Sequence, residues 1–331
     1  YWHARRGADI LKVTWDPSGK TQESSATIAA EQARLLDARA TEDGPLKGSN
    51  VISAEYTAPF QAHACMEPMN ATVAIGQSGA EVWVSTQAPG IMRSGVATAL
   101  GLLPDQVTVH STFAGGGFGR RVYPNAVIEA ALIAKKMGQP VKVIWSREDD
   151  IRHDMYRPAV RCRMSADIDG EAVKSWRFRI CGPSLQATLV EGIRDRLFPT
   201  GLPEAEFNAI VDQTEQGDTE NIEGAADSPY KLGEMDADQI MWRPGIPVSF
   251  WRSVGHSHNG FFMEGFIDEM AHHANADVVE FRRAHLDEGS RMRAVLDRVV
   301  ELANWGDTAD GVYQGIALDA IKGAVCGQVA D

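Results

Sequence analysis

The chain has 331 residues, 44% of them hydrophobic, with 32 Lys and Arg residues against 45 Asp and Glu residues, a net charge of -13. This length and composition suffice for a buried core and for about two domains. The acidic balance leaves no basic field that could hold a phosphate backbone, so we exclude nucleic acid as a partner.

The sequence also argues against a membrane span and a metal bound by side chains. Its best apolar stretch, residues 126–134, is far shorter than the roughly 20 residues of a transmembrane helix. The four cysteines form no Cys-x-x-Cys pair, which argues against a zinc site or an iron–sulfur cluster held by this chain. Two histidine pairs, His256 with His258 and His272 with His273, lack further ligands at compatible spacing, so we predict no protein-ligated metal.

We expect residues 1–49 to be a connecting segment and residues 50–181 to form a first α/β subdomain. Because the chain begins at Tyr1 without Met, we also expect it to start inside a longer protein. The predicted elements of the subdomain are strands 81–85, 106–111 and 141–145, a helix 126–136 capped by Gly138, and a hairpin of strands 160–168 and 172–180 that turns at Asp169-Gly170.

Residues 182–249 are rich in Gly, Pro, Asp and Glu, and we expect an acidic irregular lobe or connection there. Residues 250–331 are expected to be helical. The predicted helices are 260–274, a second that begins at Asp277 and ends near Gly289, and a third from Ser290 to Trp305. These elements together predict a mixed α+β fold.

The most distinctive local feature is the glycine-rich segment AGGGFGRR at residues 114–121. Glycines let a backbone approach a ligand closely, and successive amides near a helix start can bind anionic groups. The segment is neither a GxGxxG dinucleotide motif nor a Walker loop. Taken alone, it is equally compatible with a plain chain reversal.

Three further segments place polar groups beside Gly or Pro, namely QAHACMEP (residues 61–68), STQAP (85–89) and FWRSVG (250–255). In this order the four segments resemble the molybdenum-binding large subunits of the xanthine dehydrogenase and aldehyde oxidase family. They are most like the isoquinoline 1-oxidoreductase beta branch, and the likeness runs from Leu11 to Asp331. The resemblance therefore implies the molybdenum-cofactor-binding fold of that family, truncated at both ends.

The resemblance implies roles for particular residues, each with a plainer alternative. Gln61 would donate from its side chain toward an oxygen on molybdenum, and Arg252 would lie beside the pterin unless it only pairs with a carboxylate. Val254 would flank the substrate. The remaining residues implied at the cofactor are Gly116, Gly117, Phe118, Gly119, Arg120 and Ser253.

Arg120 and Arg121 could fork onto phosphate oxygens, or they could simply belong to a solvated helix end. Glu67 looks like a general base, but the resemblance implies a structural role. The family's catalytic glutamate, carried by a GxGE motif near the C-terminus of the subunit, has no counterpart in this sequence. Glu67, Glu234 and Glu264 are the available substitutes, and Glu264 is expected to pair with Arg252.

By implication, the cofactor is molybdenum with molybdopterin cytosine dinucleotide, and the protein is bacterial, in either the cytoplasm or the periplasm. The implied reaction is the oxidation of an aldehyde or an N-heteroaromatic compound, with electrons leaving through [2Fe-2S] clusters on a separate small subunit. One rival is a non-catalytic module that binds a cofactor or nucleotide, which the missing glutamate favours. The other rival, a dinucleotide-dependent dehydrogenase, is disfavoured by the missing GxGxxG motif. The coding sequence beyond Asp331 distinguishes the hydroxylase from the non-catalytic module. A GxGE motif there would indicate the enzyme, and a stop codon would indicate the module.

Overall fold

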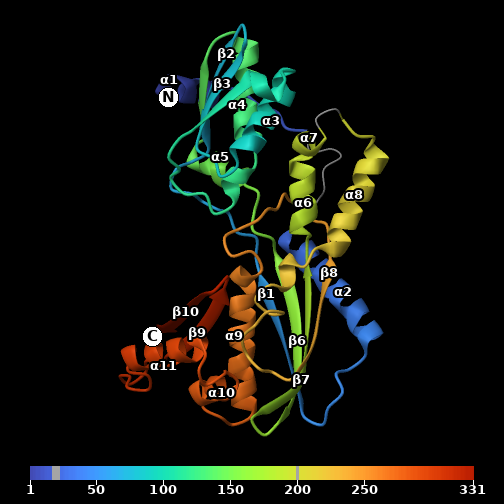
Figure 1. The fold of residues 1–331 in the computed structure, drawn as a ribbon, viewed down its shortest axis with the longest axis vertical. Coiled ribbons are helices and arrows are strands. Elements are labelled where there is room, and N and C mark those ends of the chain that lie inside the picture. Colours follow the sequence, from blue (N-terminus) through green and yellow to red (C-terminus); the bar gives the residue numbers. More distant parts are fainter. Residues whose placement is uncertain (17–22, 199–200) are drawn as a thin grey trace.

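The computed structural model describes residues 1–16, 23–198 and 201–331 and contains two four-stranded sheets and one hairpin (Figure 1). The longer sheet has the strand order β1-β6-β7-β8. Strands β1, β6 and β7 pair antiparallel, whereas β8 runs parallel to β7. The bounds are β1 (Val51–Ala58), β6 (Val160–Asp169), β7 (Ala172–Gly182) and β8 (Glu234–Met241).

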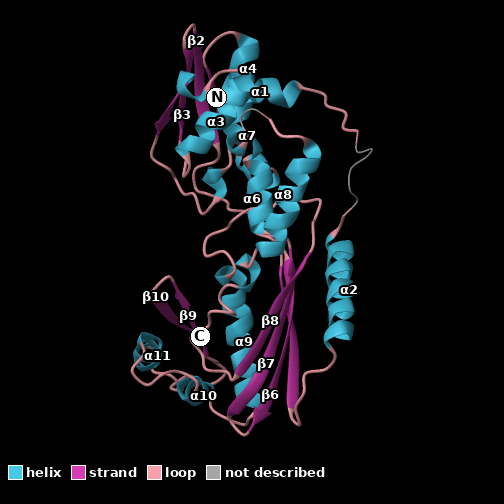
Figure 2. Ribbon diagram, turned by 45° about the vertical axis from the view of Figure 1, so that its right-hand side comes forward, coloured by secondary structure: helices cyan, strands magenta, loops and turns pink. Residues whose placement is uncertain are grey.

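Two helices, α9 (His256–His273) and α2 (Ser25–Asp43), cover opposite faces of this sheet (Figure 2). Every second residue of β6 is buried, as expected for a strand with two different faces. On the α9 side, Phe262, Phe266 and Met270 are fully buried at helical spacing. Each such side chain stabilises the fold by about 1.5–3 kcal/mol, so α9 anchors the main core.

The smaller sheet lies above the long sheet in the view of Figure 1 and has the order β4-β3-β2-β5. Its only parallel pair among the described strands is β3 with β4. Helices α3 and α4 pack on it through Met92, Val96 and Ala130. The bounds are β2 (Asn70–Gly76), β3 (Gly79–Val84), α3 (Pro89–Leu100), η1 (Pro104–Gln106), β4 (Val107–Ser111), η2 (Arg120–Val122), α4 (Asn125–Met137), β5 (Val141–Ile144) and α5 (Arg147–Arg152).

The remaining elements lie at the two ends of the chain and between β7 and α9. Among the described residues, no helix is long and apolar enough to cross a membrane. The bounds are α1 (Trp2–Ile10), α6 (Leu185–Gly192), α7 (Arg194–Leu197), α8 (Glu204–Gly217), η3 (Glu220–Ile222), α10 (Val278–Ala284), α11 (Arg291–Leu302), β9 (Gly315–Ile321) and β10 (Ala324–Ala330).

Several local predictions agree with the structure. Gly138 ends α4 in the left-handed conformation at φ 66°, and Gly170 turns the β6–β7 hairpin at φ 63°. Asp277 and Ser290 accept hydrogen bonds from the first turns of α10 and α11.

Four expectations are corrected. Residues 182–249 are not irregular, because they contain α6, α7, α8, η3 and β8. Residues 1–49 contain the 19-residue helix α2. The helix begun by Asp277 ends at Ala284 rather than near Gly289, and the segment after α11 folds into the β9–β10 hairpin. Residues 50–181 do not form one separate subdomain, because they contribute strands to both four-stranded sheets.

Candidate functional site

The four motif segments of the sequence meet where the chain passes between the two sheets. Residues 59–69 link β1 of the long sheet to β2 of the small sheet, and residues 112–119 follow β4. The amide of Arg252 donates to the carbonyl oxygen of Phe118 at 2.9 Å. His63 is buried, and its Nε2 lies 3.0 Å from the carbonyl oxygen of Phe250. Segments far apart in sequence thus surround one loop.

The loop at Gly116–Gly119 has an unusual backbone. Gly116, Phe118 and Gly119 adopt positive φ values of 103°, 55° and 107°, whereas Gly117 does not. Within the described chain, the amides of Gly116, Gly117 and Phe118 donate no hydrogen bond. Consecutive amides in such a backbone form a concavity that binds anionic or oxygen-rich groups. The sequence predicted these amides near the start of a helix. In the structure they do not belong to an α-helix N-terminus, because α4 begins only at Asn125.

Glu67 anchors Gly115, the residue directly before this loop. Its carboxylate accepts hydrogen bonds from the Gly115 amide at 2.9 Å and from Asn70 at 2.8 Å, and it lies 3.0 Å from the guanidinium of Arg121. Burial raises the pKa of Glu67, but these hydrogen bonds and the charge of Arg121 outweigh burial, and its pKa is lowered. A carboxylate stabilised in its charged form is a poor general base, so the geometry supports a structural role.

Arg121 is fully buried and makes no approach to solvent. Its guanidinium donates to the Gly116 carbonyl oxygen, to Ser85 Oγ at 2.7 Å and to the Glu67 carbonyl oxygen at 2.7 Å. The interpretation of Arg121 as a phosphate ligand or as part of a solvated helix end is therefore wrong. Its charge holds the loop against the 67–68 and 85–87 segments.

Arg120 is corrected in the same way. Its Nε lies 2.8 Å from Asp154 Oδ1, its Nη1 donates to Asn125, and its guanidinium carbon lies 5.6 Å from the ring centre of Trp145. Asp154 also lies 3.1 Å from Nδ1 of His63. Because all of these groups face the interior, Arg120 is not free to fork onto a phosphate group.

Gln61 and Arg252 present polar side chains beside the loop segments. The backbone of Gln61 pairs with Arg157, which fixes its position, while its side chain is exposed. Neither side chain makes a hydrogen bond or an ion pair to any part of the chain that the structure describes. The expected pair between Arg252 and Glu264 is therefore not formed.

The carboxylates expected for Arg252 pair with Arg282 instead. The guanidinium of Arg282 donates to Glu264 Oε2 at 3.0 Å and to Asp268 Oδ1 at 2.6 Å. Burial raises the pKa of Glu264, although the charge of Arg282 partly opposes this. Glu264 ties α9 to α10 and to the amide of Leu318 on β9, so it lies within the core.

Ser253 and Val254 occupy a strained turn directly before α9. Both residues have positive φ, 73° for Ser253 and 48° for Val254, a conformation that β-branched residues rarely adopt. Strain of this kind costs of order 1–3 kcal/mol per residue and is concentrated at functional sites. It supports a ligand-facing role for this turn.

The histidine pairs do not form a metal centre. His256 lies between Asp319 and Asp227, and His273 contacts Asn50. No group of three or more His, Cys, Asp or Glu side chains within residues 1–16, 23–198 and 201–331 is arranged to hold a metal ion.

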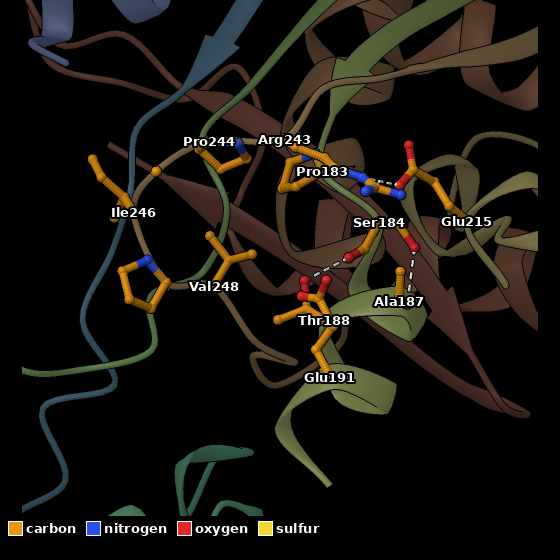
Figure 3. Close-up of a pocket in the computed structure, with 12 residues that line it drawn as sticks. Pro183, Ser184, Ala187, Thr188, Glu191, Glu215, Arg243, Pro244, Ile246 and Val248 are labelled. Atoms are coloured by element: carbon orange, nitrogen blue, oxygen red, sulfur yellow. Dashed lines mark hydrogen bonds and ion pairs between the residues drawn. The ribbon is translucent and has the colours of Figure 1, made fainter. Parts of the chain in front are cut away.

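A cavity of about 320 Å³ lies near the segment that leads to Phe250, and Figure 3 shows the side chains that line it. Ser184 lines it and caps α6 by accepting a hydrogen bond from the Ala187 amide. Arg243 reaches Glu215 across the cavity and also pairs with Asp212. These polar groups serve local structure, and none of the site residues predicted from sequence lines this cavity.

Sequence reasoning missed two residues of the site. Gln87 accepts hydrogen bonds from the amides of Gly119 and Arg121 through its side-chain oxygen. The sequence carried a signal for Gln87, because it lies in the STQAP segment, but that motif was assigned no role for its glutamine. Asp154 carried no such signal, because its partner His63 is 91 residues away.

In a comparison with known protein families, residues 32–174 match the family described as the molybdopterin cofactor-binding domain. The chain is 35% identical to isoquinoline 1-oxidoreductase subunit beta of Brevundimonas diminuta over 81% of this chain and 33% of that protein. It is 29% identical to "membrane-bound aldehyde dehydrogenase [pyrroloquinoline-quinone]" of Gluconacetobacter polyoxogenes over 93% of this chain and 42% of that protein.

A solved structure, quinoline 2-oxidoreductase from Pseudomonas putida 86, superposes with a TM-score of 0.62 at 17% identity, covering 82% of this chain and 36% of that one. At this identity the likeness shows the fold alone. The chain spans between 33% and 42% of the lengths of these three proteins. The comparisons confirm the predicted family resemblance and the mixed α/β fold class.

Proposed function

We propose that this chain forms part of the cofactor site of a molybdenum hydroxylase large subunit, because residues 32–174 match the molybdopterin cofactor-binding domain family. The proposed reaction is the oxidation of an aldehyde or an N-heteroaromatic compound with oxygen derived from water. The proposed cofactor is molybdenum with molybdopterin cytosine dinucleotide, and the proposed electron acceptor is a small subunit that carries [2Fe-2S] clusters. The names of the relatives support both substrate classes.

The observation that carries the proposal is the set of three unpaired amides at Gly116, Gly117 and Phe118. A Cβ atom on Gly117 would lie 2.6 Å from Gln87 Oε1, and one on Gly119 would overlap the carbonyl oxygen of Phe250. Other groups of the chain thus pack against both glycines, which favours glycine at these positions. The three free amides and the unpartnered side chains of Gln61 and Arg252 are donors that fit an oxygen-rich cofactor.

When bound, the molybdenum cofactor supplies the oxygen-transfer and electron-accepting chemistry. The residues of this chain bind and orient it. The amides of Gly117 and Phe118 donate to its acceptor atoms, and the free side-chain amide of Gln61 donates from the opposite segment. Arg252, whose side chain has no partner in the described chain, would place its charge beside the pterin, and Val254, strained at φ 48°, would flank the substrate.

The proton that leaves during the reaction needs a base, and a positioned base typically contributes 10²–10⁴-fold in rate. Glu67 is held in its charged form by the loop, Glu264 is buried against Arg282, and Glu234 lies on the exposed start of β8. Within the described residues, none of these three carboxylates makes a hydrogen bond to the Gly116, Gly117 or Phe118 amide. We therefore propose that this chain alone does not turn over substrate.

The test is chemical analysis of the protein produced in a host that makes molybdenum cofactors. Inductively coupled plasma mass spectrometry measures molybdenum, and chromatography after acid hydrolysis identifies the released nucleotide. The proposal predicts molybdenum together with cytosine monophosphate. Protein that contains pyrroloquinoline quinone, flavin or NAD in place of molybdenum would overturn it.

A further inference from the structure

The imidazole ring of His63 is enclosed where the chain passes between the two sheets. His63 belongs to the linker from β1 to β2, and its side chain has no exposed surface. Its Nε2 lies 3.0 Å from the carbonyl oxygen of Phe250, and its Nδ1 lies 3.1 Å and 3.2 Å from the two carboxylate oxygens of Asp154. The ring therefore joins the segment after α5 to the segment that leads into α9.

The groups on the two sides of this ring fix its protonation state. A carbonyl oxygen only accepts hydrogen bonds, so Nε2 must carry a proton to bond Phe250. Asp154 is ionised, because its oxygens accept the amides of His63 and Met155 and one of them lies 2.8 Å from Nε of Arg120. An ionised carboxylate also only accepts, so Nδ1 must carry a proton as well. The contacts therefore require an imidazolium with a proton on each ring nitrogen.

Asp154 balances only one of the two cations that it contacts. Within the described residues, it is the only carboxylate at ion-pair distance from either His63 or Arg120. The two other carboxylates that contact this linker each have an arginine of their own, at 3.0 Å for Glu67 with Arg121 and at 2.8 Å for Asp150 with Arg147. A surplus positive charge therefore lies at this point, and because it is buried, salt screens it little.

The bond from Nε2 ends where the glycine loop meets the 250–255 segment. A Cβ atom on Gly119 would lie 3.4 Å from His63 Nε2 and would overlap the carbonyl oxygen of Phe250. Two residues further along, the Arg252 amide donates to the carbonyl oxygen of Phe118. His63 thus holds the carbonyl group against which Gly119 packs, and its charge lies next to the loop that carries the free amides.

We propose that Asp154 and His63 form a positioning pair, in which Asp154 keeps His63 as an imidazolium and His63 holds the Phe250 segment against the glycine loop. The protonation state rests on the contacts of the described chain alone. The effect on the cofactor rests on the proposed function. There the pair fixes the spacing between the free amides and the Ser253–Val254 turn, and its surplus charge attracts an anionic cofactor.

The first measurement is nitrogen-15 NMR at pH 7 of protein labelled in its histidine rings, which distinguishes protonated from unprotonated ring nitrogens. His63 is identified by nuclear Overhauser contacts to the Trp251 ring, whose centre lies 6.4 Å away. Both ring nitrogens of wild-type His63 should be protonated. Asp154→Asn should leave only Nε2 protonated, because an amide group can donate to Nδ1. An unprotonated nitrogen in the wild type, or two protonated nitrogens in Asp154→Asn, would overturn the proposal.

The second measurement is amide hydrogen exchange of the cofactor-free protein. His63→Gln removes the charge and presents its donors on one atom, so it cannot bridge the two acceptors. The Arg252 amide should then exchange roughly tenfold faster than in the wild type, the effect of losing a hydrogen bond. His272→Gln, exposed on α9, is the matched control and should exchange like the wild type. Unchanged exchange at Arg252 in His63→Gln would overturn the holding role.

The third measurement is the rate at which the loaded protein loses molybdenum on dialysis. His63→Gln should lose the metal roughly tenfold faster than the wild type, and His272→Gln should lose it at the wild-type rate. Equal retention in His63→Gln and the wild type would overturn the effect of the pair on the cofactor. A wild-type protein that never contains molybdenum would instead overturn the proposed function, which the NMR measurement does not depend on.

Discussion

Replacing Gly119 with Ala tests how tightly the glycine loop is fitted to the 250–255 segment. Gly119 has a φ of 107°, and a non-glycine residue in a rarely populated conformation costs about 1–3 kcal/mol. The new Cβ would lie 2.9 Å from the carbonyl carbon of Phe250 and overlap its oxygen. The clash has to be relieved by separating two backbone segments, since no flexible side chain can move aside.

Such a separation breaks the bonds from the Arg252 amide to Phe118 and from the Gly119 amide to Gln87. Each contributes about 0.5–1.5 kcal/mol. Together with the backbone strain, Gly119→Ala should lower the free energy of unfolding by about 2–6 kcal/mol. Urea unfolding followed by circular dichroism measures the change as a shift in midpoint.

The control for this variant is Gly217→Ala at the end of α8. An added Cβ there meets nothing within 4 Å, and Gly217 has no positive φ. The control should be unchanged or slightly more stable than the wild type. A Gly119→Ala protein whose midpoint equals that of Gly217→Ala would refute the described fit between the two segments.

Two further predictions concern buried charged or titratable groups. Arg121→Met leaves the Glu67 carboxylate without its cation and three acceptors without a donor. The free energy of unfolding, measured with urea, should fall by about 3–5 kcal/mol. An unchanged urea midpoint would contradict this network of contacts. Burial, with a contribution from Arg157, lowers the pKa of His258 from 6.5 to about 3. As the pH falls from 7.5 to 5, the unfolded chain protonates this histidine while the folded chain does not, so stability should fall by about 2 kcal/mol through this residue. His258→Leu should remove that part of the pH dependence, and a variant with the same pH dependence as the wild type would show that the histidine is solvated.

Features with local causes could be predicted from the sequence. Gly138 and the Asp169-Gly170 turn were recognised because helix caps and hairpin turns depend on a few adjacent residues. Helix α2 was missed because its buried residues, Ile28, Gln32 and Leu36, form a narrow stripe that includes a polar side chain. The β9–β10 hairpin did carry a signal in the sequence, the glycine at Gly323, which takes a positive φ at the turn together with Lys322.

The candidate site could be predicted only in part. The motifs identified the loop and its neighbours, and the structure brings them together. The roles of Arg120 and Arg121 were misjudged because arginine is almost never fully buried unless paired, and their partners Asp154 and Glu67 lie far away in sequence. Which amides of the loop stay free depends on Gln87 and could not be predicted without coordinates.

The central claim is that the Gly116–Phe118 amides hold the cofactor, and the molybdenum-to-protein ratio of Gly117→Val tests it most directly. Gly117 does not have a positive φ, so a substitution there adds no backbone strain of that kind. A branched side chain there would instead displace Gln87 Oε1, the acceptor of the Gly119 and Arg121 amides, and so disturb the loop that carries the free amides. The account predicts a folded protein, judged by circular dichroism, that contains no molybdenum when purified beside a molybdenum-loaded wild type. A folded variant with wild-type molybdenum content would contradict the account.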